Sequence, residues 1–109
     1  MADIGRMSRP LTLERAVDTP DDVGGFTRRW CRIARLWAAV ERSQAISSER
    51  DRSDRRELAM TYRVTLRWRG DVTGNCRFRD GRRLLAVLSA ADPDGRRRRL
   101  VCVVEEVTP

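Results

Sequence analysis

Nine consecutive residues, 60–68, alternate without a break between apolar or aromatic side chains and threonine or arginine. One face of this alternation comprises Met60, Tyr62, Val64, Leu66 and Trp68. The opposite face comprises Thr61, Arg63, Thr65 and Arg67, and Arg69, just after the run, continues it. Successive side chains of a β-strand point to opposite faces of a sheet. The pattern therefore predicts a strand with one face in a core and the other outside it.

Turn signals divide most of the remaining chain into short apolar runs. Asp80 and Gly81 form a strong two-residue hairpin signal. Proline, aspartate and glycine gather at residues 19–25 and again at 92–95, where we expect further turns. The runs that we expect to form strands are residues 11–17, 76–79, 84–88 and 100–104.

Short strands joined by tight turns indicate an all-β architecture. We predict a mainly β fold, a small antiparallel β-barrel or rolled sheet of about six strands. A chain of 109 residues is near the usual size of one domain. We place this single domain at residues 11–109, after a flexible N-terminal arm at residues 1–10. A long charged loop, residues 42–59, is inserted between the second and third strands.

Residues 30–41 fit two structures. Trp30, Ile33 and Trp37 fall at helical spacing, whereas Ile33, Trp37 and Ala39 also share a strand face. Periodicity alone favours a helix. Because the strand pattern also fits, the residues by themselves do not decide between the two structures.

The predicted core contains a cluster of large side chains. Its expected members are Trp37, Leu66, Trp68 and Val101. The three cysteines are far apart and have no metal-binding or disulfide spacing, so we expect each to be a reduced, buried apolar residue. They are Cys31, Cys76 and Cys102.

The sequence carries no catalytic pattern. It contains no histidine, which removes Ser–His and Cys–His nucleophile pairs and every histidine-containing metal site. Its carboxylates are scattered, and no glycine-rich phosphate loop is present. We therefore expect no enzyme activity, no cofactor and no metal. No apolar run is long enough for a membrane span or a secretory signal, so we expect synthesis in the cytoplasm and no membrane partner.

The charge is large and entirely arginine-based on the basic side. All 23 basic residues are arginine, against 16 acids, which gives a net charge of +7. Arginine is suited to phosphates and carboxylates. Five arginines form a candidate basic contact face, toward nucleic acid or an acidic neighbouring subunit, with a solvated strand face as the alternative: Arg63, Arg67, Arg69, Arg77 and Arg79. The arginines at residues 96–99 are expected at a turn, as a solvated tip or a second contact.

Residues 42–59 are the strongest candidate for a functional segment. They carry five arginines and four acids, with only Ile46 and Leu58 as large apolar residues. A connection of this length in a compact domain is usually functional or disordered. Our candidate residues are Ser43, Gln44, Ser48, Glu49, Arg50, Asp51, Arg52, Asp54, Arg55, Arg56 and Glu57.

The order of landmarks along the chain resembles a known family. These landmarks are Leu11–Arg15, Gly24–Gly25, Trp30, Trp37–Ala38, Val64–Trp68, Gly81–Arg82 and Leu100–Cys102. Together they resemble the head–tail joining proteins of tailed bacteriophages, also called head-closure, stopper or adaptor proteins. The resemblance covers residues 11–104 and favours a long strand, not a helix, at residues 30–41.

The resemblance implies a virion protein of a phage, a prophage or a gene transfer agent. It implies a homo-oligomeric ring, a hexamer or dodecamer, between the portal or its adaptor and the tail terminator or tail tube. Packaged double-stranded DNA would pass through the channel, and residues 42–59 would be a channel or stopper loop. The competing interpretations are a small-barrel nucleic-acid-binding module and a host-directed interaction protein.

Overall fold

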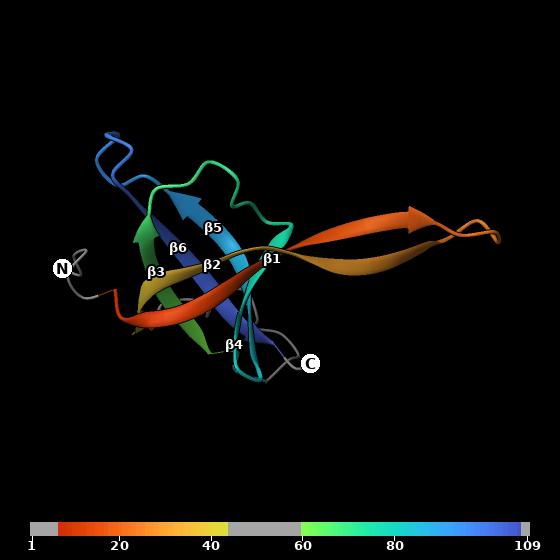
Figure 1. Cartoon of the computed structure of the whole chain (residues 1–109), viewed down its shortest axis with the longest axis horizontal. Helices are drawn as coiled ribbons and strands as arrows, with labels where there is room; N and C mark the ends of the chain where they lie inside the picture. Colours follow the sequence, from red (N-terminus) through yellow and green to blue (C-terminus); the bar gives the residue numbers. More distant parts are fainter. Residues whose placement is uncertain (1–6, 44–59, 108–109) are drawn as a thin grey trace, which may run out of the picture.

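Six antiparallel strands close into one barrel. The computed structural model describes residues 7–43 and 60–107. The strands are β1 (Arg9–Pro20), β2 (Phe26–Ser43), β3 (Thr61–Arg67), β4 (Cys76–Asp80), β5 (Arg83–Ala91) and β6 (Arg99–Val107). They follow the order β1-β2-β3-β6-β5-β4 around the barrel (Figure 1). The described parts contain no helix. The predicted mainly β fold is confirmed.

Strand β2 includes residues 30–41, so the strand interpretation is confirmed there. The helical spacing of its tryptophans has a local cause. Ala34 pairs with Leu13, but Arg32 pairs with Glu14, which leaves Ile33 as an extra residue in β2. Such a β-bulge moves the following side chains to the opposite face. Trp30 and Trp37 therefore share the outer face although they are seven residues apart.

The core lies inside the barrel and contains fewer large aromatic side chains than the sequence predicted. Phe78 of β4 is its largest fully buried side chain, and the core also contains leucines and valines of β1, β3, β5 and β6 together with Ala38 of β2. Leu66 is buried as predicted, and Trp68 packs against the core while partly exposed. The prediction for Trp37 is wrong, because 60% of this residue is exposed on the outer face of β2. Val101 is only half-buried.

Two of the three cysteines are buried. Cys76 and Cys102 lie in the core, and burial raises the pKa of the Cys102 thiol to about 12. Cys31 is exposed, because its part of β2 extends beyond the barrel. The prediction of a buried residue is therefore wrong for Cys31.

The alternation that predicted β3 is largely present. Val64 and Leu66 point into the core, and Arg63 and Arg67 are exposed. Thr65, expected on the solvent side, is nevertheless buried. In β5, a bulge between Val87 and Ser89 interrupts the register.

The strand order is not the sequence order. Strand β3 pairs with β2 and β6, whereas β4 pairs with β1 and β5. Residues 68–75 therefore cross from one side of the barrel to the other. A two-residue turn then connects β4 to β5, where Gly81 has a φ of +65°, a conformation that glycine adopts without steric cost.

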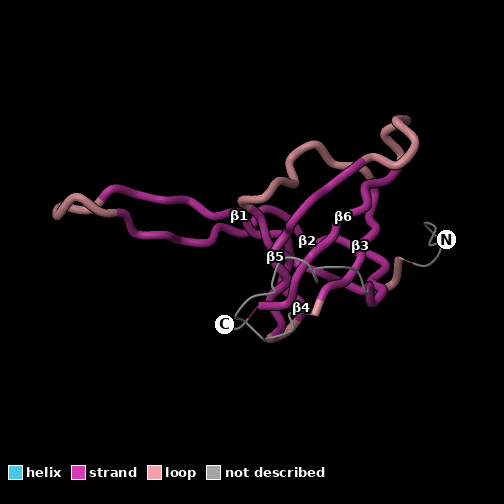
Figure 2. Tube along the Cα trace, turned by 180° about the vertical axis from the view of Figure 1, so that it is seen from behind, coloured by secondary structure: helices cyan, strands magenta, loops and turns pink. Residues whose placement is uncertain are grey.

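The first two strands are longer than the barrel needs. Strand β1 pairs with β4 only up to Arg15, and β2 pairs with β3 only from Ala38 onward. Residues 16–30 form a two-stranded hairpin that projects from the barrel, and we call them the hairpin arm (Figures 1 and 2). The arm gives the molecule its long axis, with extents of 49 × 34 × 27 Å. Nothing in the sequence analysis predicted this projection.

The turn of the hairpin arm is held by one carboxylate. Asp21 Oδ1 accepts hydrogen bonds from the backbone amides of Val23 and Gly25, at 3.0 and 2.8 Å. Gly24 has a φ of +85°. The turn predicted at residues 19–25 is confirmed, although β1 continues to Pro20.

Candidate assembly surfaces

One end of the barrel holds both attachment points of the charged segment. Strand β2 ends at Ser43 and β3 begins at Thr61. Thr61 Oγ1 donates a hydrogen bond to the carbonyl oxygen of Ser43 at 2.8 Å. The backbone amide of Glu106 donates to the carbonyl oxygen of Met60 at 2.9 Å. We call this the loop end of the barrel.

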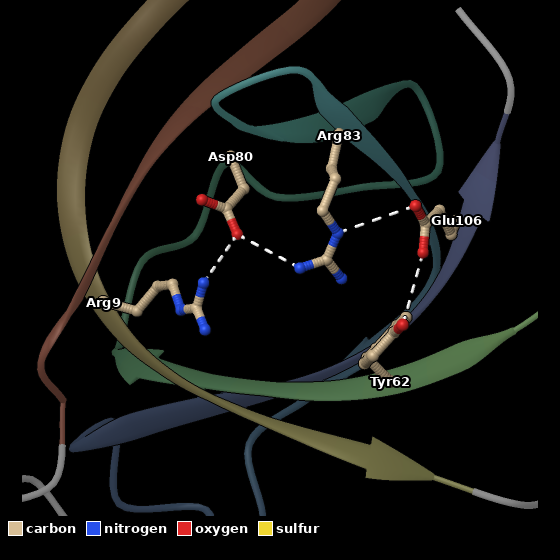
Figure 3. A network of polar contacts seen from close by, with 5 residues as sticks. All are labelled: Arg9, Tyr62, Asp80, Arg83 and Glu106. Atoms are coloured by element: carbon tan, nitrogen blue, oxygen red, sulfur yellow. Dashed lines mark hydrogen bonds and ion pairs between the residues drawn. The ribbon is translucent and has the colours of Figure 1, made fainter.

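A polar network surrounds the loop end (Figure 3). Asp80 Oδ2 lies 3.0 Å from Arg9 Nη1 and 3.4 Å from Arg83 Nη1. Arg83 Nε lies 3.6 Å from Glu106 Oε2. Tyr62 OH donates to Glu106 Oε1 at 3.2 Å, and the Arg83 guanidinium lies 5.0 Å from the centre of the Tyr62 ring. These five side chains come from five different strands.

The network fixes the rim from which the charged segment departs. Each ion pair is partly exposed, so each contributes little free energy alone. Together they connect the ends of β1, β4, β5, β6 and β3, and the Thr61–Ser43 bond adds β2. Sequence reasoning missed these residues, because partners such as Arg9 and Asp80 are 71 positions apart. A charged residue at each end of a tight hairpin was the only local signal.

The opposite end of the barrel is rich in arginine. Residues 92–98 join β5 to β6 there, and Asp92 accepts hydrogen bonds from the amides of Gly95 and Arg97 at 3.1 and 2.8 Å. The Arg97 guanidinium lies 5.1 Å from the centre of the Trp68 ring. Asp94 pairs with Arg98 at 3.1 Å. The arginines at this end are therefore presented by a hydrogen-bonded loop.

The five arginines of the predicted basic face do not form one stripe. Arg63, Arg67 and Arg69 lie on β3 or just after it, and Arg77 and Arg79 lie on β4. Because β3 and β4 are not neighbours in the barrel, the prediction of one continuous face is wrong. Four of the five pair with carboxylates of this chain. The pairs are Arg63–Glu41, Arg69–Asp71, Arg77–Glu14 and Arg79–Glu14.

Glu14 holds two of these arginines on the outer face of the barrel. Arg77 Nε donates to Glu14 Oε1 at 2.7 Å, and Arg79 Nε donates to Oε2 at 3.0 Å. Burial alone would raise the pKa of Glu14. The hydrogen bonds and positive charges of Arg77 and Arg79 outweigh this effect, so the pKa is below its usual value. Glu14 is therefore a carboxylate at neutral pH.

Arg77 also contacts the hairpin arm. The Arg77 guanidinium stacks over the Trp30 ring at 4.0 Å from its centre, with Arg28 at 5.8 Å. At the base of the arm, the amide of Ala16 donates to the carbonyl oxygen of Asn75 at 2.9 Å. These contacts fix the direction in which the arm leaves the barrel.

Most candidate residues of the charged segment lie outside the described residues. Ser43 ends β2. The others fall within residues 44–59, so their predicted role stays a prediction. Within residues 7–43 and 60–107, no cluster of side chains could hold a metal ion. The described part also has no helix that is long and apolar enough to cross a membrane.

The described surfaces are of a kind that other proteins can bind. A closed barrel with a projecting arm, ion pairs at its rim and exposed apolar side chains such as Trp37 offers surfaces for contacts with other proteins.

The comparisons agree with one another. Residues 2–107 match the family described as phage head completion protein, so the chain belongs to this family. A chain of the virion of a native gene transfer agent particle is similar, with 25% identity and a TM-score of 0.72 over 95% of this chain and 98% of that one. Protein SF1141 from Shigella flexneri 2a is similar, with 29% identity and a TM-score of 0.67 over 96% of both chains. No curated protein sequence matches the chain significantly.

Family membership confirms the resemblance seen in the sequence. The chain is a structural virion protein of the head–tail region of a phage or gene transfer agent particle. It interacts with other virion proteins in that setting.

Proposed function

We propose that copies of this protein form a ring below the portal or its adaptor. The ring closes the DNA-filled head and provides the surface on which the tail docks. Membership of the head completion family supports this role. The structural observation that carries it is the loop end, where one rim of the barrel holds both attachment points of residues 44–59.

In this proposal the barrel is a frame and the charged segment is the gate. The rim network connects the strand ends around the attachment points, so load on the segment is spread over the whole barrel. Residues 42–59 carry five arginines and four acids. Such balanced charge suits ion pairs between neighbouring subunits around a channel better than attraction to DNA alone.

A monomeric nucleic-acid-binding module is less well supported. Four of the five arginines that suggested it are paired with carboxylates of this chain. Their charge is therefore partly neutralised before any phosphate approaches. A salt titration with short duplex DNA separates the two functions, since the module requires tight binding by a monomer with steep salt dependence.

The test replaces residues 44–58 with a Gly-Ser linker of four residues. Because the contacts of the rim lie outside this segment, we expect the purified variant to melt at nearly the temperature of the native protein. Particles assembled with it should lose packaged DNA or fail to join tails, which DNA protection assays and electron microscopy measure.

A matched control keeps the length and composition of residues 44–58 but shuffles their order. If mixed charge and length are sufficient, the shuffled variant restores DNA retention. If particles with the Gly-Ser linker retain their DNA, join tails and transfer genes normally, the gate proposal is wrong.

A further inference from the structure

The outer face of the β1–β2 ladder has exposed apolar side chains at both of its ends. At the tip of the hairpin arm, Phe26 is 69% exposed and Val23 is 84% exposed, beside exposed Pro20. We call these three residues the tip patch. On the barrel, Trp37 is 60% exposed and pairs with exposed Pro10. We call these two residues the flank patch.

The aromatic side chain between the two patches, Trp30, is less exposed than those in the patches. Trp30 is half-buried, because Arg77 and Arg28 of its own chain stack over its ring. No such cover protects Phe26 or Trp37 within the described residues. Exposed apolar side chains at the centre of a patch are typical of interaction sites.

One molecule cannot bring its own two patches together. Pro20 pairs with Phe26 at one end of the ladder, and Pro10 pairs with Trp37 at the other. The two prolines are ten positions apart on β1, which is roughly 33 Å along the strand. In Figure 1 the start of β1 and the tip of the hairpin arm lie on opposite sides of the barrel. Any contact between the patches is therefore between two molecules.

The direction of the hairpin arm indicates which molecule that is. In Figures 1 and 2 the arm leaves the side of the barrel and does not extend past the loop end or the arginine-rich end. This inference rests on the proposed ring, in which the barrel ends face the components above and below. The neighbours at the side are then copies of the same chain.

Charge at the two patches is also complementary. Asp22 is exposed in the turn beside Val23, and Arg35 is exposed two residues before Trp37 on the same strand. Neither has an ion-pair partner among the described residues. A tip docked on a flank would place opposite charges close to its apolar contact.

We propose that the tip patch of each subunit packs on the flank patch of the next copy, head to tail around the ring. The contact is heterologous, with different surfaces on its two sides, so it closes only as a ring or continues as a filament. It is also small. Two aromatic side chains bury about 150–250 Å² each, well below the roughly 1,200 Å² of a stable interface. A single contact therefore does not hold two free subunits, and the ring forms where the portal brings subunits together.

The test uses thiol cross-linking in assembled particles. Val23→Cys and Pro10→Cys are combined in a Cys31→Ser background, where the two natural cysteines that remain are buried. A short bismaleimide cannot join the two new thiols within one chain. Head-to-tail contacts give a ladder of dimers, trimers and larger species up to the full ring. Each single-cysteine variant gives no ladder.

Substitutions in the same background test the two patches. Phe26→Ser or Trp37→Ala should reduce species larger than dimers at least tenfold, while the purified variants keep their melting temperature. Val17→Ser is the matched control, because it removes an apolar side chain from the other face of the same arm. It should leave the ladder unchanged.

Other patterns overturn the inference. Dimers alone would mean a closed pair of subunits, and an adduct with another virion protein would mean that the hairpin arm contacts the portal or tail. Monomers alone, or a full ladder with Trp37→Ala, would also contradict it. The proposed gate has its own test, DNA retention in particles whose residues 44–58 are replaced, so failure of one proposal is distinguishable from failure of the other.

Discussion

The Glu14 side chain links parts of this protein that are far apart in the sequence. Its carboxylate holds Arg77 and Arg79 of β4, and Arg77 in turn stacks on Trp30 of the hairpin arm. The arm, β1 and β4 are therefore connected through a single carboxylate. The charge-assisted bonds are mostly shielded, with 11% of the Glu14 side chain and 14% of the Arg77 side chain exposed.

We expect Glu14→Gln to lower the free energy of unfolding by about 1–2 kcal/mol at pH 7, since it weakens two charge-assisted hydrogen bonds. The pKa of Glu14 is lowered in the folded protein from 4.5. Its contribution to stability is therefore present above about pH 4.5 and is lost as the pH falls through the lower, folded-state pKa. Urea unfolding at pH 7 and pH 3 should show the difference between variants shrink.

The control for this prediction is Asp18→Asn, which weakens an exposed ion pair with Arg28 in the hairpin arm. It should leave stability unchanged at either pH. Equal stability of Glu14→Gln and the native protein at pH 7 would show that Glu14 does not hold the base of the arm.

At the scale of elements, the hairpin arm is separate from the barrel that carries it. Its two strands pair with each other and with no third strand beyond Arg15 and before Ala38. A two-stranded hairpin alone is marginally stable in water. Its base contacts at Trp30 and Ala16 therefore determine whether it keeps its direction.

We expect the barrel to fold without the outer part of the arm. Val17 pairs with Arg29, so residues 18–28 can be replaced by Asn-Gly, which forms a tight hairpin turn. Because Trp30 and Ala16 remain, the melting temperature should change by only a few degrees. Particles should no longer incorporate the protein as a ring. A variant that unfolds would show instead that the arm is part of the folding unit.

At the scale of the whole molecule, the small core and the small patches point to the same behaviour. Phe78 is the only aromatic side chain among the largest fully buried residues described. The protein therefore has a modest core, and its most exposed aromatic side chains, Phe26 and Trp37, lie in two patches that one subunit cannot bring together.

The purified protein should be monomeric or weakly associated in solution and oligomeric only in particles. Sedimentation velocity across a range of concentrations, compared with images of particles, measures this directly. A stable dimer at low micromolar concentration would contradict it, because a paired subunit would enter a ring only after dissociation.

The amino-acid sequence by itself determined the β class, the position of most strands and turns, and the family. These properties depend on local patterns: alternation at residues 60–68, the Asp80–Gly81 hairpin signal and the order of landmarks along the chain. They are readable because side-chain direction in a strand repeats every two residues. The same rule failed at residues 30–41, where the extra residue Ile33 imitates a helical period.

Only the tertiary structure decided which strands are neighbours, and this settled the surfaces. The insertion of β6 beside β3 separated Arg63 and Arg67 from Arg77 and Arg79. Because the β1–β2 ladder extends beyond the barrel, Cys31 lies outside the core. Trp37 is exposed on the outer face of β2. Side-chain period gives two faces to every strand, but pairing between distant segments determines which face is covered. That pairing also brought Arg9 to Asp80 and Glu14 to Arg77, contacts that no local pattern specifies.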